Sequence, residues 1–208
     1  MPVTQPPMDS SRAIPLEEDL YQPLIDFLNQ EQDLVAQRID EKRSRNAKGA
    51  GGNQWLHPDV VALRPMPDAW HRLVKDVVLS GGGLPMQLHS YEVKRKLTRS
   101  NIRQHFFQTV SNSSWANEGY LVAVEIDERA EKELRMLSTL HGIGFILLDP
   151  ENPTESDIML PARPRTAVDW ESVNRLVDEN KDFKQFIEGV ETYLKTGKLV
   201  AFGNRRRS

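Results

Sequence analysis

Apolar residues recur with a helical period near the start of the chain and with a strand period further on. Leucines at every fourth position from Leu16 to Leu28 predict a helix over residues 14–28, with acids in its first turn. Pro23 implies a kink, or two short helices with Pro23 near the start of the second. Residues 33–43 fit either a helix or a strand. We favour a strand, because a β-sheet formed by the strands predicted below needs an edge strand here.

The remaining pattern predicts alternating strands and helices. The expected strands are residues 59–65, 86–96, 119–126, 143–150 and, at an edge, 157–165. The expected helices are residues 100–115 with Ser100 as N-cap, 128–142, and two terminal helices over 169–197 that divide near Asn180. Residues 68–83 predict a short helix or an irregular insertion. This order predicts an α/β fold in which helices flank a central mixed β-sheet, with a C-terminal helical extension.

The same pattern suggests one domain with short extensions, as a chain of 208 residues allows. Residues 1–14 are rich in Pro and Ser and predict a disordered N-terminal segment. Residues 15–162 would form the core, and residues 163–200 would supply C-terminal helices packed on it. Residues 201–208 form a basic tail, and residues 44–54 predict a mobile, Gly-rich, basic loop.

Composition narrows the classes of function. The chain has no cysteine, which excludes disulfides, zinc–thiolate sites and thiol catalysis and fits a reducing compartment. No apolar run approaches the length of a membrane span, and the first residues lack the apolar stretch of a signal peptide, so we expect a cytoplasmic protein. The net charge of −3 means that any nucleic-acid-binding surface would have to be local.

Two acidic residues stand in or beside apolar strands, where acids are unusual. Glu92 and Lys94 lie two apart on one predicted strand, so both side chains lie on the same face. If the strand of Asp59 is its neighbour, both carboxylates can converge on a cation such as Mg²⁺ or Mn²⁺, with the carbonyl of Val93 as a third ligand. An ammonium beside the cation could orient or deprotonate a water molecule and offset charge on a phosphorane-like transition state.

These residues resemble a known motif. Pro58-Asp59 followed by Glu92-Val93-Lys94 is similar to the PD-(D/E)XK nuclease motif. The longer stretches 55–63 and 91–126 resemble restriction-endonuclease-like proteins of the HrgA type, which are bacterial proteins often linked to restriction–modification loci. The resemblance covers roughly Leu16 to Val190.

The resemblance implies a restriction-endonuclease-like core and assigns roles to several residues. Asp59 and Glu92 would bind the metal, and Lys94 would be the catalytic lysine. An acid on the first helix often assists the metal in such proteins, and either Glu17 or Glu18 could do so. We prefer Glu18.

Many such proteins also carry a glutamine on the helix that follows the lysine strand. Gln104 and Gln108 are four apart and share one helix face, and Gln108 is the better candidate because it lies nearer the middle of the helix. The chain also offers His57, His89 and His105 as candidate general bases. Their spacing forms no zinc motif, and a surface or packing role is the simpler interpretation for each.

A basic run follows the predicted catalytic strand and enters the next helix. We expect its side chains to contact a nucleic-acid backbone, together with one amide: Arg95, Lys96, Arg99, Arg103 and Gln104. The basic loop from Lys42 to Lys48 and the tail from Arg205 to Arg207 could extend this surface. The alternative is a solvated face with no ligand.

The sequence therefore predicts a metal-dependent endonuclease that acts on DNA, with RNA not excluded, in bacterial defence or restriction. A homodimer or a partner protein would supply specificity. The alternative is a catalytically silent module that binds DNA or another protein within a larger defence complex. Taken alone, Asp59 could also be a turn residue after Pro58, and Glu92 and Lys94 could form a solvent-facing stripe on an edge strand.

Overall fold

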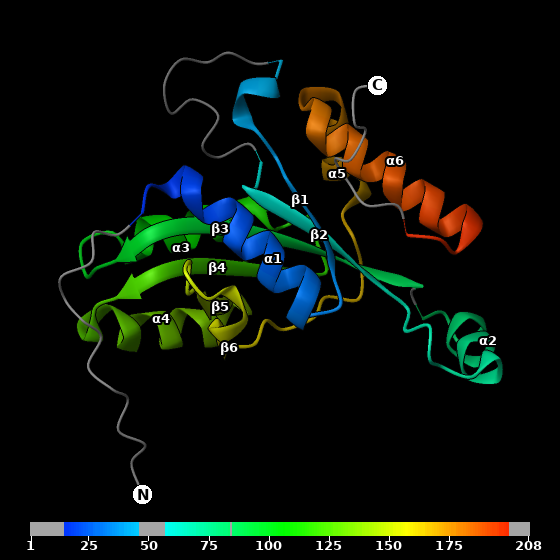
Figure 1. Ribbon diagram of the computed structural model, residues 1–208, viewed down its shortest axis with the longest axis horizontal. Helices are drawn as coiled ribbons and strands as arrows, with labels where there is room; N and C mark the ends of the chain where they lie inside the picture. Colours follow the sequence, from blue (N-terminus) through cyan, green and yellow to red (C-terminus); the bar gives the residue numbers. More distant parts are fainter. Residues whose placement is uncertain (1–14, 46–56, 84, 200–208) are drawn as a thin grey trace, which may run out of the picture.

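A six-stranded open sheet forms the centre of the molecule (Figure 1). The computed structural model describes residues 15–45, 57–83 and 85–199, and within them the strands lie side by side in chain order. They are β1 (Val35–Arg38), β2 (Val60–Pro65), β3 (Met86–Leu97), β4 (Glu118–Ile126), β5 (Gly144–Leu147) and β6 (Asp157–Leu160). β3, β4 and β5 are parallel, whereas the β1–β2, β2–β3 and β5–β6 pairs are antiparallel. The predicted α/β fold with a mixed sheet is confirmed.

Helices cover both faces of this sheet (Figure 1). The α-helices of the described residues are α1 (Tyr21–Glu31), α2 (Arg72–Ser80), α3 (Ile102–Asn112), α4 (Glu128–His141), α5 (Trp170–Glu179) and α6 (Lys181–Thr196), of which all but α2 pack on the sheet. The described residues also form three short 3₁₀ helices: η1 (Glu17–Leu20), η2 (Glu41–Arg43) and η3 (Pro153–Glu155). α1 covers one face of the sheet, and α3 to α6 pack on the other.

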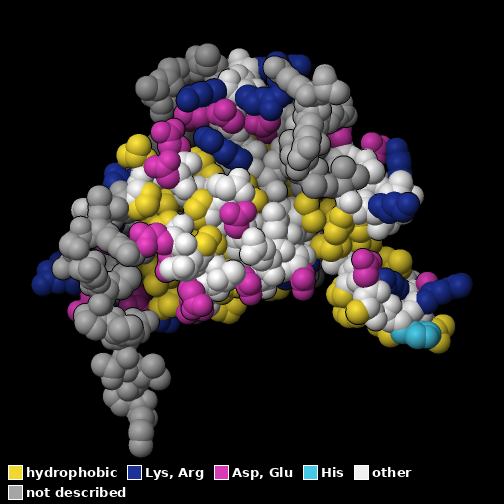
Figure 2. Space-filling model, in the orientation of Figure 1, with side chains coloured by type: hydrophobic (Ala, Val, Ile, Leu, Met, Phe, Trp, Pro, Cys, Tyr) yellow, Lys and Arg dark blue, Asp and Glu magenta, His cyan; other side chains and the backbone are white. Residues whose placement is uncertain are grey.

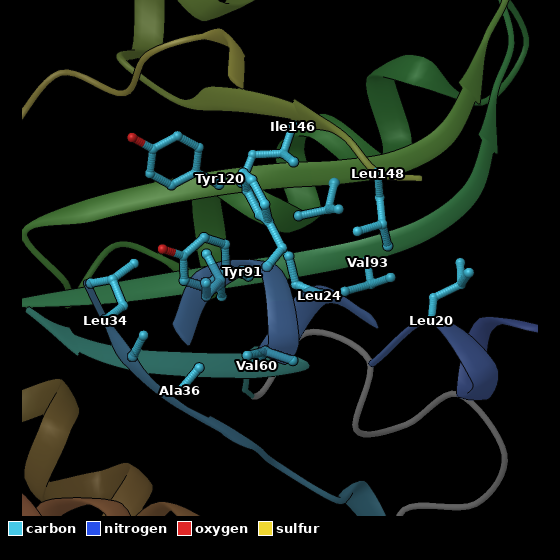
Figure 3. Close-up of a cluster of buried hydrophobic side chains, with 14 of the residues drawn as sticks. Leu20, Leu24, Leu34, Ala36, Val60, Tyr91, Val93, Tyr120, Ile146 and Leu148 are labelled. Carbon is cyan, nitrogen blue, oxygen red and sulfur yellow. The ribbon is translucent and has the colours of Figure 1, made fainter. Parts of the chain in front are cut away.

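The core under α1 contains the side chains from one face of β3 (Figure 3). Tyr91 and Val93 are buried in the same cluster as Leu24 of α1. Since successive side chains of a strand point to opposite faces, the neighbours Glu92 and Lys94 face α3 instead. Burial of the odd-numbered residues therefore fixes the direction of both charged side chains.

The opposite face holds two further clusters of buried apolar residues. α3 and α4 pack on β4, with Phe106 and Leu134 near Leu121 in one cluster. α5 and α6 pack on β2 and β3, and there the rings of Trp115 and Phe183 meet edge to face with centroids 5.1 Å apart. The C-terminal helices thus bury an apolar face against the strands that carry the candidate site.

Several expectations for individual elements are confirmed. Residues 14–28 contain two short helices, η1 and α1, and Pro23 lies in the first turn of α1, where its missing N–H needs no partner. Residues 33–43 contain the strand β1. Asn180 divides the terminal helices, and its side chain caps α6 by accepting hydrogen bonds from the N–H groups of Asp182 and Phe183.

Two predictions of element ends are wrong. The first helical residue of α3 is Ile102, and the residue before it is Asn101 rather than the predicted N-cap Ser100. The Asn101 side chain turns away from the helix because it binds the Thr98 N–H and the Lys96 carbonyl. β2 begins at Val60, so Asp59 precedes the strand.

Some predicted segments lie outside the described residues. These are the N-terminal segment 1–14, most of the loop 44–54, and the basic tail 201–208. The division of the chain at residue 162 stays a prediction. No helix within the described ranges has the length and apolar character needed to cross a membrane.

The segment predicted as a short helix or an irregular insertion contains α2. This helix stands away from the sheet (Figure 1) and has no buried residue. Apolar side chains cover much of its surface (Figure 2), and Leu73 and Val77 are among the most exposed large apolar residues described. α2 therefore contributes little to the core.

Burial predicts unequal costs for the same substitution at two leucines. Leu24 is 0% exposed and Leu73 is 66% exposed. We expect Leu24→Ala to lower the free energy of unfolding by about 2–5 kcal/mol because it opens a cavity under α1. We expect Leu73→Ala to change it by less than about 0.5 kcal/mol. Urea unfolding of both variants measures the difference, and equal effects would contradict this description of the core.

Candidate active site

The candidate site lies where β2 begins and β3 continues without it. β2 pairs with β3 as far as Val60 and Tyr91, and the Asp59 N–H adds one bond of 3.1 Å to the Tyr91 carbonyl. Beyond Tyr91, β3 keeps its parallel partner β4 on one side only. The Asp59 carboxylate takes the place of the missing strand, since its Oδ2 accepts the Val93 N–H at 2.8 Å.

Three carboxylates meet around the ammonium of Lys94. Its Nζ lies 2.9 Å from Glu92 Oε1, 3.4 Å from Glu17 Oε1 and 3.9 Å from Asp59 Oδ2. The acids come from η1, from the residue before β2 and from β3 itself. The three residues of the predicted motif are therefore brought together, although the chain separates Asp59 from the other two.

Two amides of α3 hold the Glu92 carboxylate from the other side. Gln108 Nε2 donates to Oε1, and Asn112 Nδ2 donates to Oε2 at 2.9 Å. The resemblance predicts a role for Gln108 but none for Asn112. Asn112 follows Gln108 by four residues and so shares its helix face, which is the sequence signal that could have identified it.

Burial and charge shift the proton affinities of this cluster. Burial raises the pKa of Glu92 and the nearby Asp59 raises it further, while Lys94 lowers it in part. Burial also raises the pKa of Glu17. For Lys94, burial alone would lower the pKa, but Asp59, Glu92 and Glu17 outweigh burial and hold it above the usual value. Lys94 is therefore an ammonium at neutral pH.

A pocket of about 580 Å³ opens over this cluster. Glu17 and Glu18 both line it, but Glu18 is exposed, whereas Glu17 contacts Lys94. The structure thus favours Glu17 over Glu18, the reverse of the preference drawn from the sequence. The pocket lining also includes Arg38, which the sequence did not single out, and Lys42, which the sequence offered only as the start of a basic loop.

The predicted backbone-binding residues lie outside this pocket. Lys96 Nζ lies 3.0 Å from Glu125 and 3.5 Å from Asp127, and Arg103 pairs with Glu133. The remaining three, Arg95, Arg99 and Gln104, are exposed. Arg95 donates a hydrogen bond to the Pro15 carbonyl at 2.6 Å. Gln104 is thus exposed and Gln108 is buried, although they lie four residues apart on the same helix.

The three histidines named as candidate general bases fall into two groups. His57 and His105 line the pocket, and His57 Nε2 lies 3.0 Å from the Ser44 hydroxyl. Burial, helped by the charge of Lys94, lowers the pKa of His105 to about 4, so its ring is neutral at pH 7. His89 is fully buried and stacks with Tyr91 and Tyr120, which favours a packing role.

The oxygen donors of the site suit a hard cation. Within the described residues, no group of three or more His, Cys, Asp or Glu side chains is arranged to hold a metal ion. Mg²⁺, however, needs only one or two carboxylates, with water completing its shell. Asp59 and Glu92 both contact one cationic atom, Lys94 Nζ. The Val93 carbonyl points to the same side of β3 as its N–H, toward Asp59, so these donors fit Mg²⁺ once the ammonium moves aside.

Comparison with known proteins gives no further indication of function. The chain matched no family model, and searches of curated proteins and of solved structures found no match. The functional interpretation therefore rests on the geometry of this chain and on the resemblance of its motif.

Removal of the ammonium tests the charge balance of the site. In Lys94→Met, the buried Glu92 loses its counter-ion, and we expect the free energy of unfolding at pH 8 to fall by about 3 kcal/mol. The pKa of Glu92 in the folded variant rises further above its unfolded value. The folded state then binds more protons than the unfolded state, so stability falls as pH rises through that interval.

Urea unfolding at several pH values measures this effect, and Lys96→Met is the matched control. Both lysines lie on the same strand face, but the Lys94 side chain is 8% exposed and that of Lys96 is 42% exposed. We expect Lys96→Met to have a much smaller effect, because its ion pairs are exposed to solvent. A pH-independent loss in Lys94→Met would contradict the assigned charge cluster.

Proposed function

We propose that this protein is a metal-dependent nuclease that hydrolyses phosphodiester bonds, with DNA as the preferred substrate. The observation that carries the proposal is the meeting of Asp59, Glu92 and Lys94 at the open edge of β3. Two carboxylates and an ammonium at one point are the groups that this hydrolysis needs. The resemblance of the same residues to the PD-(D/E)XK motif agrees with this proposal.

The residues divide the work by their chemistry. Asp59, Glu92 and the Val93 carbonyl would hold Mg²⁺ or Mn²⁺, which supplies a Lewis acid and lowers the pKa of a bound water. The surrounding carboxylates raise the pKa of Lys94 in this structure. Its ammonium would donate hydrogen bonds to the attacking water and offset charge on the reacting phosphate.

The groups around these residues act on their orientation. Gln108 and Asn112 each donate to one oxygen of Glu92, so the carboxylate plane is fixed before a substrate arrives. Glu17 is the third acid at the ammonium and is our candidate for the assisting carboxylate. We also propose that the sheet from β2 to β5, with α1 and α3, is a restriction-endonuclease-like core.

A biological setting follows from the resemblance and not from the geometry. We propose a role in bacterial defence or restriction, in the cytoplasm. Because a single site cuts one strand, a second copy or a partner protein would be needed for paired cuts and for sequence specificity.

One observation favours a second candidate, a catalytically silent module that binds DNA or another protein. The Lys94 ammonium already occupies the space among the three carboxylates, as it would in a purely structural charge cluster. In that case the pocket would bind no cation. Metal binding and cleavage therefore distinguish the two candidates.

Cleavage assays test the enzyme directly. Purified protein is incubated with single-stranded DNA, duplex DNA and RNA in Mg²⁺, Mn²⁺ or EDTA. We expect cleavage that needs metal and falls by at least about 100-fold in Asp59→Asn and Glu92→Gln, because each keeps its shape but loses a ligand charge. Asp76→Asn on the exposed helix α2 is the control and should cleave normally. Full activity in both site variants would exclude the proposed mechanism.

A thermal unfolding titration tests the metal site without any substrate. Mg²⁺ or Mn²⁺ should stabilise the native protein, by about 2.7 kcal/mol at a metal concentration 100 times the Kd. Glu92→Gln should lose this stabilisation because the site keeps only one carboxylate beside Val93. Equal stabilisation of both proteins would place the metal elsewhere, and no stabilisation of either would favour the silent module.

A further inference from the structure

Part of the positive charge expected to guide nucleic acid is paired with acids where the sequence placed it. Lys96 contacts two acids at the end of β4, and Arg103 of α3 pairs with Glu133 of α4. A phosphate would have to displace these carboxylates or bind beside them. Arg95 and Arg99 are also exposed there, so the face after β3 keeps only part of the positive charge predicted for it.

A different pair of cations lies on the pocket wall. We define the β1–η2 rim as residues 38–42, which run from the end of β1 into η2 and line the pocket over Lys94. Arg38 and Lys42 are both exposed, and neither forms an ion pair with another residue of the described ranges. Figure 2 shows Lys and Arg side chains next to a band of Asp and Glu at this end of the molecule.

Arg38 is also held in a defined place. Its guanidinium carbon lies 4.3 Å from the centre of the Tyr21 ring, which lines the same pocket. A guanidinium held over a ring can still offer N–H groups to a ligand. These groups have the fork geometry that binds phosphate oxygens in pairs.

The rim itself is anchored to the start of α6. Asn180 Nδ2 donates to the Asp40 carbonyl at 2.9 Å, and Asp182 Oδ2 accepts the Asp40 N–H at 3.0 Å. Arg43 pairs with Asp182 as well. Asn180 and Asp182 are buried, so these bonds fix the backbone between Arg38 and Lys42.

The acidic side chains around Lys94 make the interior of the pocket unfavourable for phosphate. Glu17, Asp59 and Glu92 surround Lys94, so the single ammonium is already shared among three acids. A phosphodiester strand that reaches this point gains little from Lys94 before a metal binds. The rim also contains Asp40 and Glu41, so it carries no net charge. Arg38 and Lys42 would therefore attract phosphate by direct contact rather than by a net positive field.

We propose that a nucleic-acid strand enters the pocket across the β1–η2 rim, with Arg38 and Lys42 binding the phosphates that flank the reacting one. This inference rests on the proposed nuclease function and names the path of its substrate. Arg38 binds one phosphate through its N–H groups while Tyr21 supports its plane. Lys42 binds a neighbouring phosphate as a point charge.

Binding to a cleavage-deficient protein tests this path. Every variant carries Glu92→Gln, and fluorescence anisotropy with labelled single-stranded DNA, duplex DNA and RNA gives the Kd at several KCl concentrations. The rim variant is Arg38→Gln with Lys42→Gln, and the matched control is Lys96→Gln with Arg103→Gln. Each pair removes two positive charges, so the net charge of the two proteins is the same.

We expect the rim variant to bind about 10-fold more weakly or worse, and the slope of log K against log salt to fall by about 2, one for each lost phosphate contact. The control should stay within about twofold of its parent. Equal loss in both variants, loss confined to the control, or no binding by the parent protein would overturn the proposal.

A second measurement separates this inference from the proposed function. With Glu92 restored, the rim variant should raise KM for the cleaved substrate and leave kcat within a few-fold, because its contacts lie beside the reacting phosphate. If the native protein cleaves nothing but the rim variant loses binding, the nuclease assignment fails and the path stands. If the native protein cleaves and the rim variant keeps its KM, the path fails and the nuclease assignment stands.

Discussion

The contact between the buried ammonium of Lys94 and the carboxylate of Glu92 is the interaction on which the rest of the site depends. Both groups lie on the α3 face of β3, where Glu92 is 2% exposed, and each charge stabilises the other there. Asp59 and Glu17 approach the same ammonium from two other elements. One salt-bridge centre thus ties the N-terminal helices, the start of β2 and the middle of β3 together.

The irregular end of the sheet gives this centre its chemistry. A strand that paired with β3 beyond Tyr91 would satisfy the Val93 backbone and cover the carboxylates. Because β2 begins only at Val60, the Asp59 side chain reaches the Val93 N–H instead, and a pocket remains open above it. The pairing register of β2 with β3 therefore decides both where the acids meet and where a ligand can enter.

Charge is distributed unevenly around the pocket. The floor carries an excess of carboxylates, which suits a divalent cation, while the exposed cations Arg38 and Lys42 lie on the β1–η2 rim. The basic run after β3 looks suitable for phosphate in the sequence, yet Glu125, Asp127 and Glu133 neutralise part of it. These acids lie on β4, at its end and on α4, far enough along the chain that no local pattern links them to the run.

The sequence by itself determined the features that depend on neighbouring positions. Alternation along β3 placed Glu92 and Lys94 on one face, the apolar periods gave the order of strands and helices, and the capping residue Asn180 marked the division between α5 and α6. The tertiary structure alone decided the contact of Asp59 with Val93, the choice of Glu17 over Glu18 at Lys94, and the stacking of Arg38 on Tyr21. The physical reason is that backbone periodicity is local, whereas ion pairs and hydrogen bonds between distant segments depend on strand register and on the direction in which each helix meets the sheet.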